Sequence, residues 1–334
     1  MMRCLTLAAK GIRSVAPNPM VGAVLVCDGR IIGEGWHRRY GEAHAEVNCF
    51  ASVKAKDEAL IPHATLYVSL EPCSHYGKTP PCAKLVVSKH PKRVVVGMGD
   101  PNPLVAGKGI DIIKQAGIEV VCGVLEQQCR ELNKRFLCLQ EKHRPYITLK
   151  WAQSADGFID AKRHQGEPKT PVVISNSVSK ITVHKMRAEN MAILVGANTA
   201  LLDNPRLLTT RWTGNNPLRC AIDSKGVIPD SAHLMSNEAE TIIFHDLPDL
   251  RTNAAKAWET IYNELAGKGI HSLIIEGGAV TLQSVIDCGM WDEAQVEVGT
   301  TTIGKGVKAP KIGLLPQSVK RLFNHTIIEY LHQE

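Results

Sequence analysis

The sequence predicts two consecutive α/β domains. Its 334 residues exceed the usual size of one domain, and chains of this length generally divide into separate hydrophobic cores. Short β-branched runs alternate with helical patterns along the chain, which is typical of sheets covered by helices. A long helical pattern ends at Arg144-Pro145. We therefore expect domains at residues 1–144 and 145–334.

A hairpin followed by alternating helices and strands is expected in the first domain. Residues 21–36 form two apolar runs that meet at Asp28-Gly29, a dipeptide that suits a tight turn with positive φ. A helical pattern follows, with Ala43, Val47 and Phe50 on one face. Further strand-like runs occur at 64–70, 93–98 and 118–123, and helical patterns at 80–89, 109–117 and 125–142.

The second domain repeats the alternation without repeating the sequence. A loop rich in charge and proline is expected at 160–171. Strands are expected at 147–154, 191–196, 219–224, 241–246, 272–278 and 293–299, and helices at 177–189, 254–266 and 280–288. This pattern predicts a second sheet with its own core.

The composition narrows the class of protein. No apolar run approaches the roughly 18 residues of a membrane span, and the first residues contain too short an apolar run for a secretory signal. The ten cysteines are scattered, which argues against a disulfide framework. The net charge of +6 accompanies only 5% aromatic residues and no run of basic residues. We therefore expect a cytoplasmic protein without a membrane or nucleic-acid partner.

Four residues of the first domain have the pattern of a metal site. His44 and Glu46 stand at the start of a helical run, Cys73 follows a predicted strand, and Cys82 opens a predicted helix. A helix N-terminus stabilises a thiolate. One imidazole and two thiolates leave a fourth tetrahedral position for water, as catalytic zinc sites do.

Glu46 can supply the proton transfer that complements the metal. Zinc lowers the pKa of water, and a carboxylate that is not itself a ligand can carry the proton to a leaving amine. His-x-Glu followed by Pro-Cys and a second Cys is typical of zinc nucleobase deaminases, although their cysteines are usually two residues apart and here eight intervene. The alternatives are a structural zinc site and two unrelated buried cysteines.

Several longer motifs resemble those of the bifunctional riboflavin-biosynthesis deaminase-reductases. That family has the eight-residue spacer, and the resemblance covers nearly the whole chain. The motifs are PNPMVG (17–22), GWHRRYGEAHAE (35–46), EPCSHYGKTPPC (71–82), GMGDPNP (97–103), TLKWAQSADG (148–157), HKMRAENMAILVGANTALLDNPRL (184–207), AIDS (221–224) and IIEGG (274–278).

The resemblance implies a fold and a pair of reactions. It implies a cytidine-deaminase-like α/β/α domain followed by a dihydrofolate-reductase-like α/β domain. The first would use one zinc ion to deaminate 2,5-diamino-6-(5-phosphoribosylamino)pyrimidin-4(3H)-one. The second would use NADPH to reduce the ribosyl group to a ribityl chain. A homo-oligomer is also expected.

The family's motifs also imply site residues. In the deaminase, Asn18 can read a ring edge, and His75 and Lys78 could meet a phosphate, although Lys78 could equally be a solvated loop lysine. Asp100 and Asn102 suit either a pocket contact or a turn. The complete implied set is Asn18, His37, His75, Lys78, Thr79, Asp100 and Asn102, with Glu46 as the catalytic residue and His44, Cys73 and Cys82 as metal ligands.

For the second domain, residue patterns alone indicate one feature. In SLIIEGGAVTLQ, glycines between a strand and a helix could admit a phosphate, or could form a plain turn. The resemblance implies that NADPH contacts Ala152, Thr199, Asp203, Ser224, Gly278, Ala279 and Thr281. It implies that the reductase substrate contacts Lys150, Arg187, Leu207, Arg211 and Glu276.

The second domain departs from the family pattern at several positions. Pro171 and Val173 replace the serine and tryptophan of a Ser-x-Trp segment, and Asn204 replaces an aspartate. One residue is inserted before Arg211, and a late proline is a threonine in 298–306. A deaminase whose second domain is not catalytic is therefore an alternative, which NADPH binding would test. A nucleic-acid-acting deaminase or binding module is a third hypothesis, which predicts salt-sensitive binding to nucleic acid.

Overall fold

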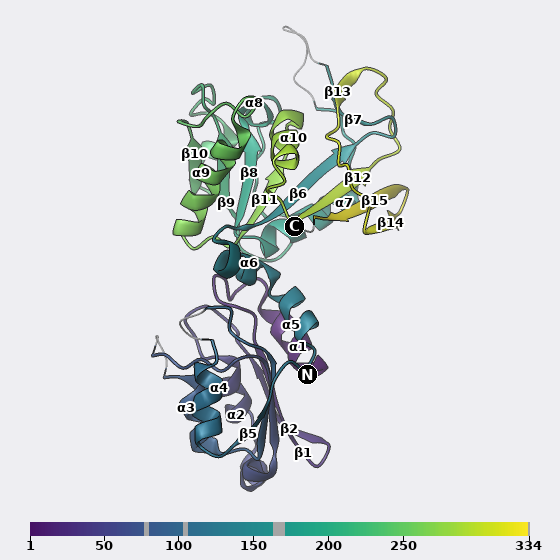
Figure 1. Cartoon of the computed structure of the whole chain (residues 1–334). Coiled ribbons are helices and arrows are strands. Elements are labelled where there is room, and N and C mark those ends of the chain that lie inside the picture. Colours follow the sequence, from purple (N-terminus) through teal and green to yellow (C-terminus); the bar gives the residue numbers. More distant parts are fainter. Residues whose placement is uncertain (77–79, 103–105, 163–170, 333–334) are drawn as a thin grey trace. The chain divides into compact units, whose positions relative to one another are not determined.

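The computed structural model describes residues 1–76, 80–102, 106–162 and 171–332. The chain divides into two compact units, Met1–His143 and Arg144–Glu334. Each unit has its own sheet, and the two are described separately (Figure 1). Among the described residues, no helix has the length and apolar character that a membrane crossing requires.

The N-terminal unit is a five-stranded sheet between two layers of helices. The strand order is β2-β1-β3-β4-β5, with β1 antiparallel to both neighbours and the β3–β4–β5 part parallel. The strands are β1 (Gly22–Cys27), β2 (Arg30–Trp36), β3 (Thr65–Leu70), β4 (Arg93–Met98) and β5 (Glu119–Val121). The helices are α1 (Met2–Ala8), α2 (Ala45–Ala51), α3 (Cys82–Lys89), α4 (Lys108–Gln115), α5 (Glu126–Leu132) and α6 (Lys134–Lys142).

Side chains that alternate along the strands supply a core on each face of this sheet. Leu25, Leu66 and Val94 pack with residues of α2, α3 and α4 on one face. On the other face, Val24 packs with α1, and Met98 with α5 and α6. The predicted hairpin turn is confirmed, because Asp28 and Gly29 have φ values of 48° and 74°, the signs that a type I′ turn needs.

One predicted helix of this unit is wrong. The pattern over 125–142 predicts a single helix, but α5 and α6 are separate helices on either side of Asn133. The side chain of Asn133 accepts from the N–H of Met20 at 2.8 Å and donates to its carbonyl oxygen at 3.0 Å. This pairing with a distant backbone accompanies the break between α5 and α6. Helix α1 was not predicted either.

The C-terminal unit is built on an eight-stranded sheet in the order β10-β9-β8-β11-β6-β12-β15-β14, parallel from β10 to β12 and antiparallel beyond. The strands are β6 (Tyr146–Gln153), β8 (Ala192–Gly196), β9 (Leu218–Ile222), β10 (Thr241–Phe244), β11 (Ser272–Glu276), β12 (Glu293–Val298), β14 (Ser318–Leu322) and β15 (His325–Leu331). A separate ribbon pairs β7 (Phe158–Ala161) with β13 (Gly306–Lys308).

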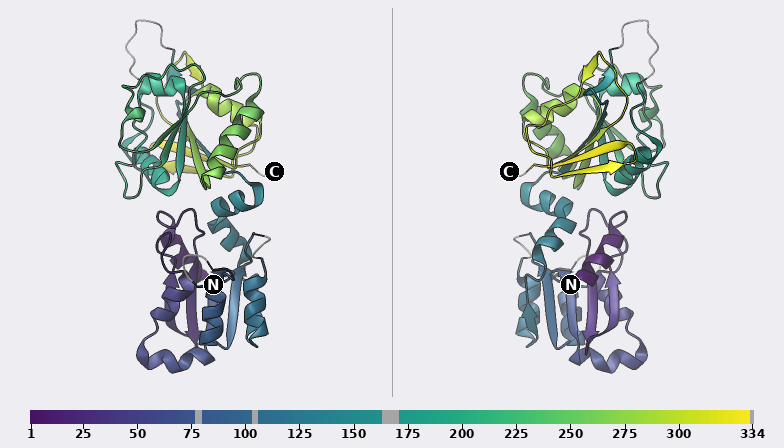
Figure 2. Two further views of the ribbon diagram at one scale, coloured as in Figure 1. Left: turned by 90° about the vertical axis from the view of Figure 1, so that its left-hand side faces the viewer. Right: turned by 90° about the vertical axis from the view of Figure 1, so that its right-hand side faces the viewer.

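Helices cover both faces of the large sheet (Figure 2). The helices are α7 (Ser177–Glu189), α8 (Ala197–Asp203), α9 (Ala254–Gly267) and α10 (Ala279–Asp287). Leu149 of β6 faces the core formed with α9 and α10, whereas Ile193 of β8 packs with α8 on the opposite face. Because side chains alternate along a strand, Lys150 points away from the face that buries Leu149. Helix α8 and strands β7, β13, β14 and β15 were not predicted from the sequence.

Candidate active sites

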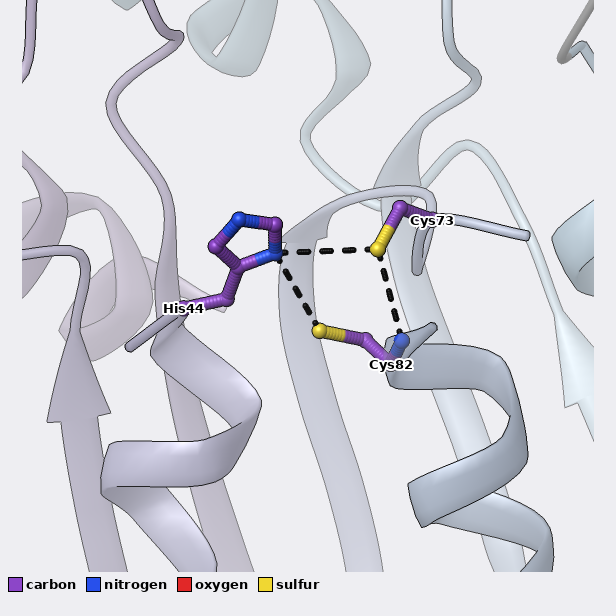
Figure 3. Close-up of side chains that lie close together, drawn as sticks. All are labelled: His44, Cys73 and Cys82. Atoms are coloured by element: carbon purple, nitrogen blue, oxygen red, sulfur yellow. Dashed lines mark hydrogen bonds between the residues drawn. The ribbon is translucent and has the colours of Figure 1, made fainter. Parts of the chain in front are cut away.

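Three ligand-type side chains converge at one point of the N-terminal unit. His44 immediately precedes α2, Cys73 follows β3 in a loop, and Cys82 is the first residue of α3. The Nδ1 atom of His44 lies 3.6 Å from Sγ of Cys73 and 3.3 Å from Sγ of Cys82. Figure 3 shows the imidazole nitrogen and both sulfur atoms turned toward one another. All three donor atoms lie within 4.8 Å of one another.

This donor set fits a zinc ion. Zinc binds thiolate sulfur at about 2.3 Å and imidazole nitrogen at about 2.0 Å in a tetrahedron, so its donor atoms are separated by roughly 3.5 to 4 Å. The Cys82 thiol and the His44 imidazole, helped by a 3.3 Å hydrogen bond from the Cys82 N–H, lower the pKa of Cys73 despite its burial. The thiolate is the form that binds metals. Three protein donors leave room for a fourth ligand.

Glu46 lies in the first turn of α2 and is only 3% exposed. Burial raises its pKa to about 7. Its carboxyl group stands outside the group of three donor atoms but lines the same cavity as His44 and Cys73. A carboxyl group with a pKa near neutrality can accept a proton and return it.

The cavity beside these residues has a volume of about 350 Å³. Of the seven implied pocket residues, it is lined by Asn18, His37, His75, Asp100 and Asn102. The other two, Lys78 and Thr79, lie outside the described residues. The lining also includes Tyr40, Glu71, Phe136 and Gln140, which sequence reasoning missed. Helical periodicity places Phe136 and Gln140 on one face of a helix, but it does not show that this face meets a cavity.

His37 presents one tautomer to the cavity. Its Nδ1 atom lies 3.1 Å from the carbonyl oxygen of Ala43, and its Nε2 atom lies 3.2 Å from Nδ2 of Asn18. Because the carbonyl oxygen can only accept, Nδ1 carries the proton and Nε2 accepts from the Asn18 amide. Burial lowers the pKa of His37, which favours this neutral form. The arrangement keeps the Oδ1 atom of Asn18 as an acceptor.

Asp100 and Asn102 combine the two roles considered for them. The N–H of Asn102 donates to Oδ1 of Asp100 at 2.9 Å, as in an Asx turn. Both residues also line the cavity. Burial raises the pKa of Asp100.

In the C-terminal unit, Lys150, Arg187 and Glu276 meet on one face of the sheet. Lys150 of β6 and Glu276 of β11 are partners in the strand register, and Arg187 of α7 donates from Nη2 to Oε2 of Glu276 at 2.9 Å. Burial opposes the ionisation of Glu276, but the charges of Arg187 and Lys150 outweigh it and hold the pKa below its ordinary value. The Nε atom of Arg187 is buried without a hydrogen-bond partner among the described residues.

The segment after α8 lies beside this cluster. The carbonyl oxygen of Leu208 accepts from Nη1 of Arg187 at 3.2 Å, next to buried Leu207 with its φ of 54°. Burial and the charges of Arg187 and Arg211 lower the pKa of His184 on α7. The N–H of Thr210, the residue before Arg211, donates to Nδ1 of His184 at 3.0 Å. Thr209, which sequence reasoning missed, has a buried hydroxyl without a partner among the described residues.

The implied NADPH contacts lie at the carboxyl ends of parallel strands. They are Ala152 in β6, Thr199 and Asp203 in α8 after β8, Ser224 after β9, and Gly278, Ala279 and Thr281 after β11. Ligands of parallel α/β sheets generally bind at this edge.

The turn at Gly277 and Gly278 fits close backbone approach. Their φ values are 83° and 42°, and a Cβ atom on Gly277 would lie 2.6 Å from Oγ1 of Thr199. A second tight contact joins the same loops, because a Cβ atom on Gly196 would lie 2.6 Å from Oγ1 of Thr281. Only glycine, which has no Cβ atom, fits at positions 196 and 277 without a clash with these threonine side chains.

One of the departures from the family pattern has a local structural role. Asn204 ends α8 with a φ of 42°, a conformation that Asn tolerates better than most residues. Its Oδ1 atom accepts from the N–H of His233 at 2.7 Å. Pro171 and Val173 precede α7, and Val173 is 67% exposed; nothing in the structure explains these two replacements.

Fold and site define a two-domain enzyme that couples a zinc-dependent deaminase to an NADPH-dependent reductase. Residues 1–98 match the cytidine and deoxycytidylate deaminase zinc-binding region. Residues 145–326 match the RibD C-terminal domain. The chain belongs to the RibD family of riboflavin biosynthesis. The expected cytidine-deaminase-like and dihydrofolate-reductase-like folds are confirmed.

Relatives of known name match along nearly their whole length. The riboflavin biosynthesis protein RibD of Aquifex aeolicus is 37% identical, covering 94% of this chain and 90% of that protein. RibD of Escherichia coli strain K12 is 34% identical, covering 92% and 89%. A solved deaminase/reductase from Thermotoga maritima is 35% identical with a TM-score of 0.86, covering 100% of this chain and 97% of that one. This coverage identifies a bifunctional deaminase and reductase.

Proposed function

We propose that the N-terminal unit deaminates 2,5-diamino-6-(5-phosphoribosylamino)pyrimidin-4(3H)-one and that the C-terminal unit reduces the ribosyl group of the product to a ribityl chain. The Thermotoga maritima relative is named a diaminohydroxyphosphoribosylaminopyrimidine deaminase and 5-amino-6-(5-phosphoribosylamino)uracil reductase. The observation that carries the proposal is the convergence of His44, Cys73 and Cys82 beside a cavity that Glu46 also lines.

His44, Cys73 and Cys82 would hold the zinc ion, and Glu46 would be the catalytic residue. Bound zinc supplies Lewis acidity, which brings the pKa of a water molecule toward neutrality. Glu46 takes one proton from the attacking water and delivers it to the ring nitrogen. It then carries the second proton of that water to the amino group, which departs as ammonia while the carbonyl forms. Its raised pKa matches this double task.

The remaining residues of the deaminase cavity would bind and orient the pyrimidine. Oδ1 of Asn18 accepts from an N–H of the ring edge, because the Nδ2 of that amide already faces His37. Asp100 and Asn102 supply a second polar wall. His75 and Lys78 are proposed to meet the ribosyl phosphate, whose charge suits lysine and imidazole donors, and Thr79 is proposed to line the same pocket.

In the reductase, NADPH supplies a hydride, and this chain's residues hold the cofactor and the sugar. Ala152, Thr199, Asp203, Ser224, Gly278, Ala279 and Thr281 are proposed for NADPH. Lys150, Arg187, Leu207, Arg211 and Glu276 are proposed for the substrate. The Nε atom of Arg187, which has no hydrogen-bond partner in the described part of the chain, offers a donor to a substrate oxygen, since a buried donor without a partner is otherwise costly.

We further propose that the enzyme works in the cytoplasm. None of the ten cysteines, all of which lie in the described part of the chain, forms a disulfide, and reduced cysteines are the rule in that compartment. Homo-oligomer formation and the lack of a nucleic-acid partner stay predictions.

A product assay by mass spectrometry tests the function. Zinc-loaded protein is given the diaminopyrimidinone substrate with and without NADPH, and a Glu46→Gln variant serves as the control. The expected result is deaminated product in both cases and ribityl product only with NADPH. Deaminated product alone, at saturating NADPH, would contradict the proposed reductase assignment. The absence of both products would contradict the proposed substrate.

A further inference from the structure

Glu71, the first residue of the loop that carries Cys73, is a buried carboxylate with an unusual set of partners. Only 4% of it is exposed. Its Oε2 atom accepts from the N–H groups of Asp100 at 3.2 Å and Gly107 at 3.0 Å. Its Oε1 atom accepts from Gly109 at 2.9 Å and Ile110 at 3.3 Å. Four backbone donors therefore saturate both oxygens.

Three of these donors belong to the start of α4. Gly107 is the N-cap residue of that helix, and no side-chain hydrogen bond from the cap position closes the helix end. A helix N-terminus exposes unpaired N–H groups and favours a negative charge. Glu71 supplies both the acceptor oxygens and the charge from more than 30 residues earlier in the chain. It therefore caps α4 across the fold.

The fourth donor, Asp100, connects this cap to the deaminase cavity. Asp100 and Asn102 line the cavity and are joined to each other by the Asx turn. On the other side, α4 packs directly on the loop of Cys73, because a Cβ atom on Gly109 would lie 1.9 Å from the carbonyl oxygen of Pro72. One carboxylate thus joins the metal-site loop, the Asp100 segment and a helix end.

We infer that Glu71 is a positioning residue for deamination, which holds the Asp100–Asn102 wall in register with the Cys73 loop. Although Glu71 lines the cavity, its oxygens are occupied by backbone N–H groups, so it acts through Asp100 rather than on the substrate. This inference rests on the proposed deaminase function. The sequence pattern assigns no role to Glu71, because the zinc-deaminase motif includes the Pro-Cys dipeptide that follows this residue but not Glu71 itself.

The test is a Glu71→Gln variant of the full-length, zinc-loaded enzyme. The side-chain amide nitrogen of the new glutamine cannot accept a hydrogen bond. The two backbone N–H groups that donate to one Glu71 oxygen in the wild type therefore lose their acceptor, and the Asp100–Asn102 wall moves. We expect the kcat/KM of deamination to fall about 10- to 100-fold, because displacements of about 1 Å in a binding site have effects of this size. Most of the loss should appear as a raised KM, with the zinc content unchanged.

Three comparisons distinguish a positioning role of Glu71 from a general loss of folding or activity. Glu58→Gln, an identical change at an exposed position of the same unit, should leave the KM unchanged. The reductase step, assayed with deaminated intermediate, should proceed normally and so report an intact chain. Glu71→Asp keeps the charge and should fall between wild type and Glu71→Gln.

An Asp100→Asn variant, alone and combined with Glu71→Gln, tests the route of the effect. If Glu71 acts through the Asp100 segment, the double variant should be no worse than the more impaired single variant. A wild-type KM in Glu71→Gln, a loss of zinc at unchanged KM, or multiplicative effects in the double variant would each overturn the inference. If Glu71→Gln does not fold, a wild-type KM in Glu71→Asp would do so. Failure of the wild-type enzyme to deaminate would instead count against the proposed function.

Discussion

Lys150 and Glu276 are register partners on the adjacent parallel strands β6 and β11. Arg187 reaches the same carboxylate from α7 at 2.9 Å. The side chains of Arg187 and Glu276 are each only 14% exposed. The hydrogen-bonded Arg187 and the charge of nearby Lys150 therefore both favour the ionised form of this largely buried carboxylate. The ionised form of Glu276 contributes to the stability of the C-terminal unit.

This arrangement predicts a pH-dependent effect of Glu276→Gln. The pKa of Glu276 is lowered from 4.5 in the folded state, so its stabilising effect is fully present above the unfolded pKa and is lost as the pH falls through the folded pKa. At pH 7 we expect the variant to lose about 2 kcal/mol of unfolding free energy, the usual size for a charged hydrogen bond. The deficit should shrink as the pH falls below 4.5.

Urea unfolding followed by tryptophan fluorescence measures this deficit. Four of the five tryptophans, Trp151, Trp212, Trp258 and Trp291, belong to the C-terminal unit, so the signal mainly reports that unit. Glu259→Gln is the matched control, because the Glu259 side chain is 53% exposed. A deficit of the same size at all pH values would show that the charge of Glu276 is not responsible.

Glu46→Gln should abolish proton transfer while leaving the metal site occupied. We expect the kcat of deamination to fall about 10²- to 10⁴-fold, the usual contribution of a general acid or base. Zinc content, measured by elemental analysis, should stay at one ion per chain, because Glu46 stands outside the group of three donor atoms. Substantial residual turnover would argue that another group carries the proton.

Removal of zinc should separate the two activities. Among the described residues, the one group of clustered His, Cys, Asp or Glu side chains suited to a metal is in the N-terminal unit. Dialysis against a chelator should therefore stop ammonia release but leave NADPH oxidation with the deaminated intermediate. Added zinc should restore ammonia release. Loss of both activities on chelation would mean that the metal also supports the reductase.

Gln140→Ala should raise the KM of deamination about tenfold, which corresponds to roughly 1.4 kcal/mol of lost binding. Gln140 and Phe136 line the cavity from α6, and no hydrogen bond to another described residue engages the Gln140 amide. Residues 134–142 lie beyond the matched zinc-binding region, which ends at residue 98. Steady-state kinetics compare this variant with Gln127→Ala, an exposed position on α5. Equal KM values would remove Gln140 from the substrate contacts.

The sequence predicted most strands and helices because each has a local signal. The hairpin at Asp28-Gly29 needs only a turn dipeptide between apolar runs, and His44, Cys73 and Cys82 stand beside recognisable strand and helix ends. The helix over 125–142 was wrong because the bonds of Asn133 to Met20 lie outside any local pattern. The same holds for Glu71, whose backbone partners come 29 to 39 residues later.

By itself, the sequence determined the chemistry available to this protein: a histidine and two cysteines for a metal, a glutamate for proton transfer, and glycines at a strand end. These signals depend on residue type and short spacing, which the printed chain contains. Only the tertiary structure decided that Glu71 caps α4, that Phe136 and Gln140 face the deaminase cavity, and that Lys150 lies beside Glu276. Those relationships depend on strand register and on packing between distant segments, which local propensity does not encode.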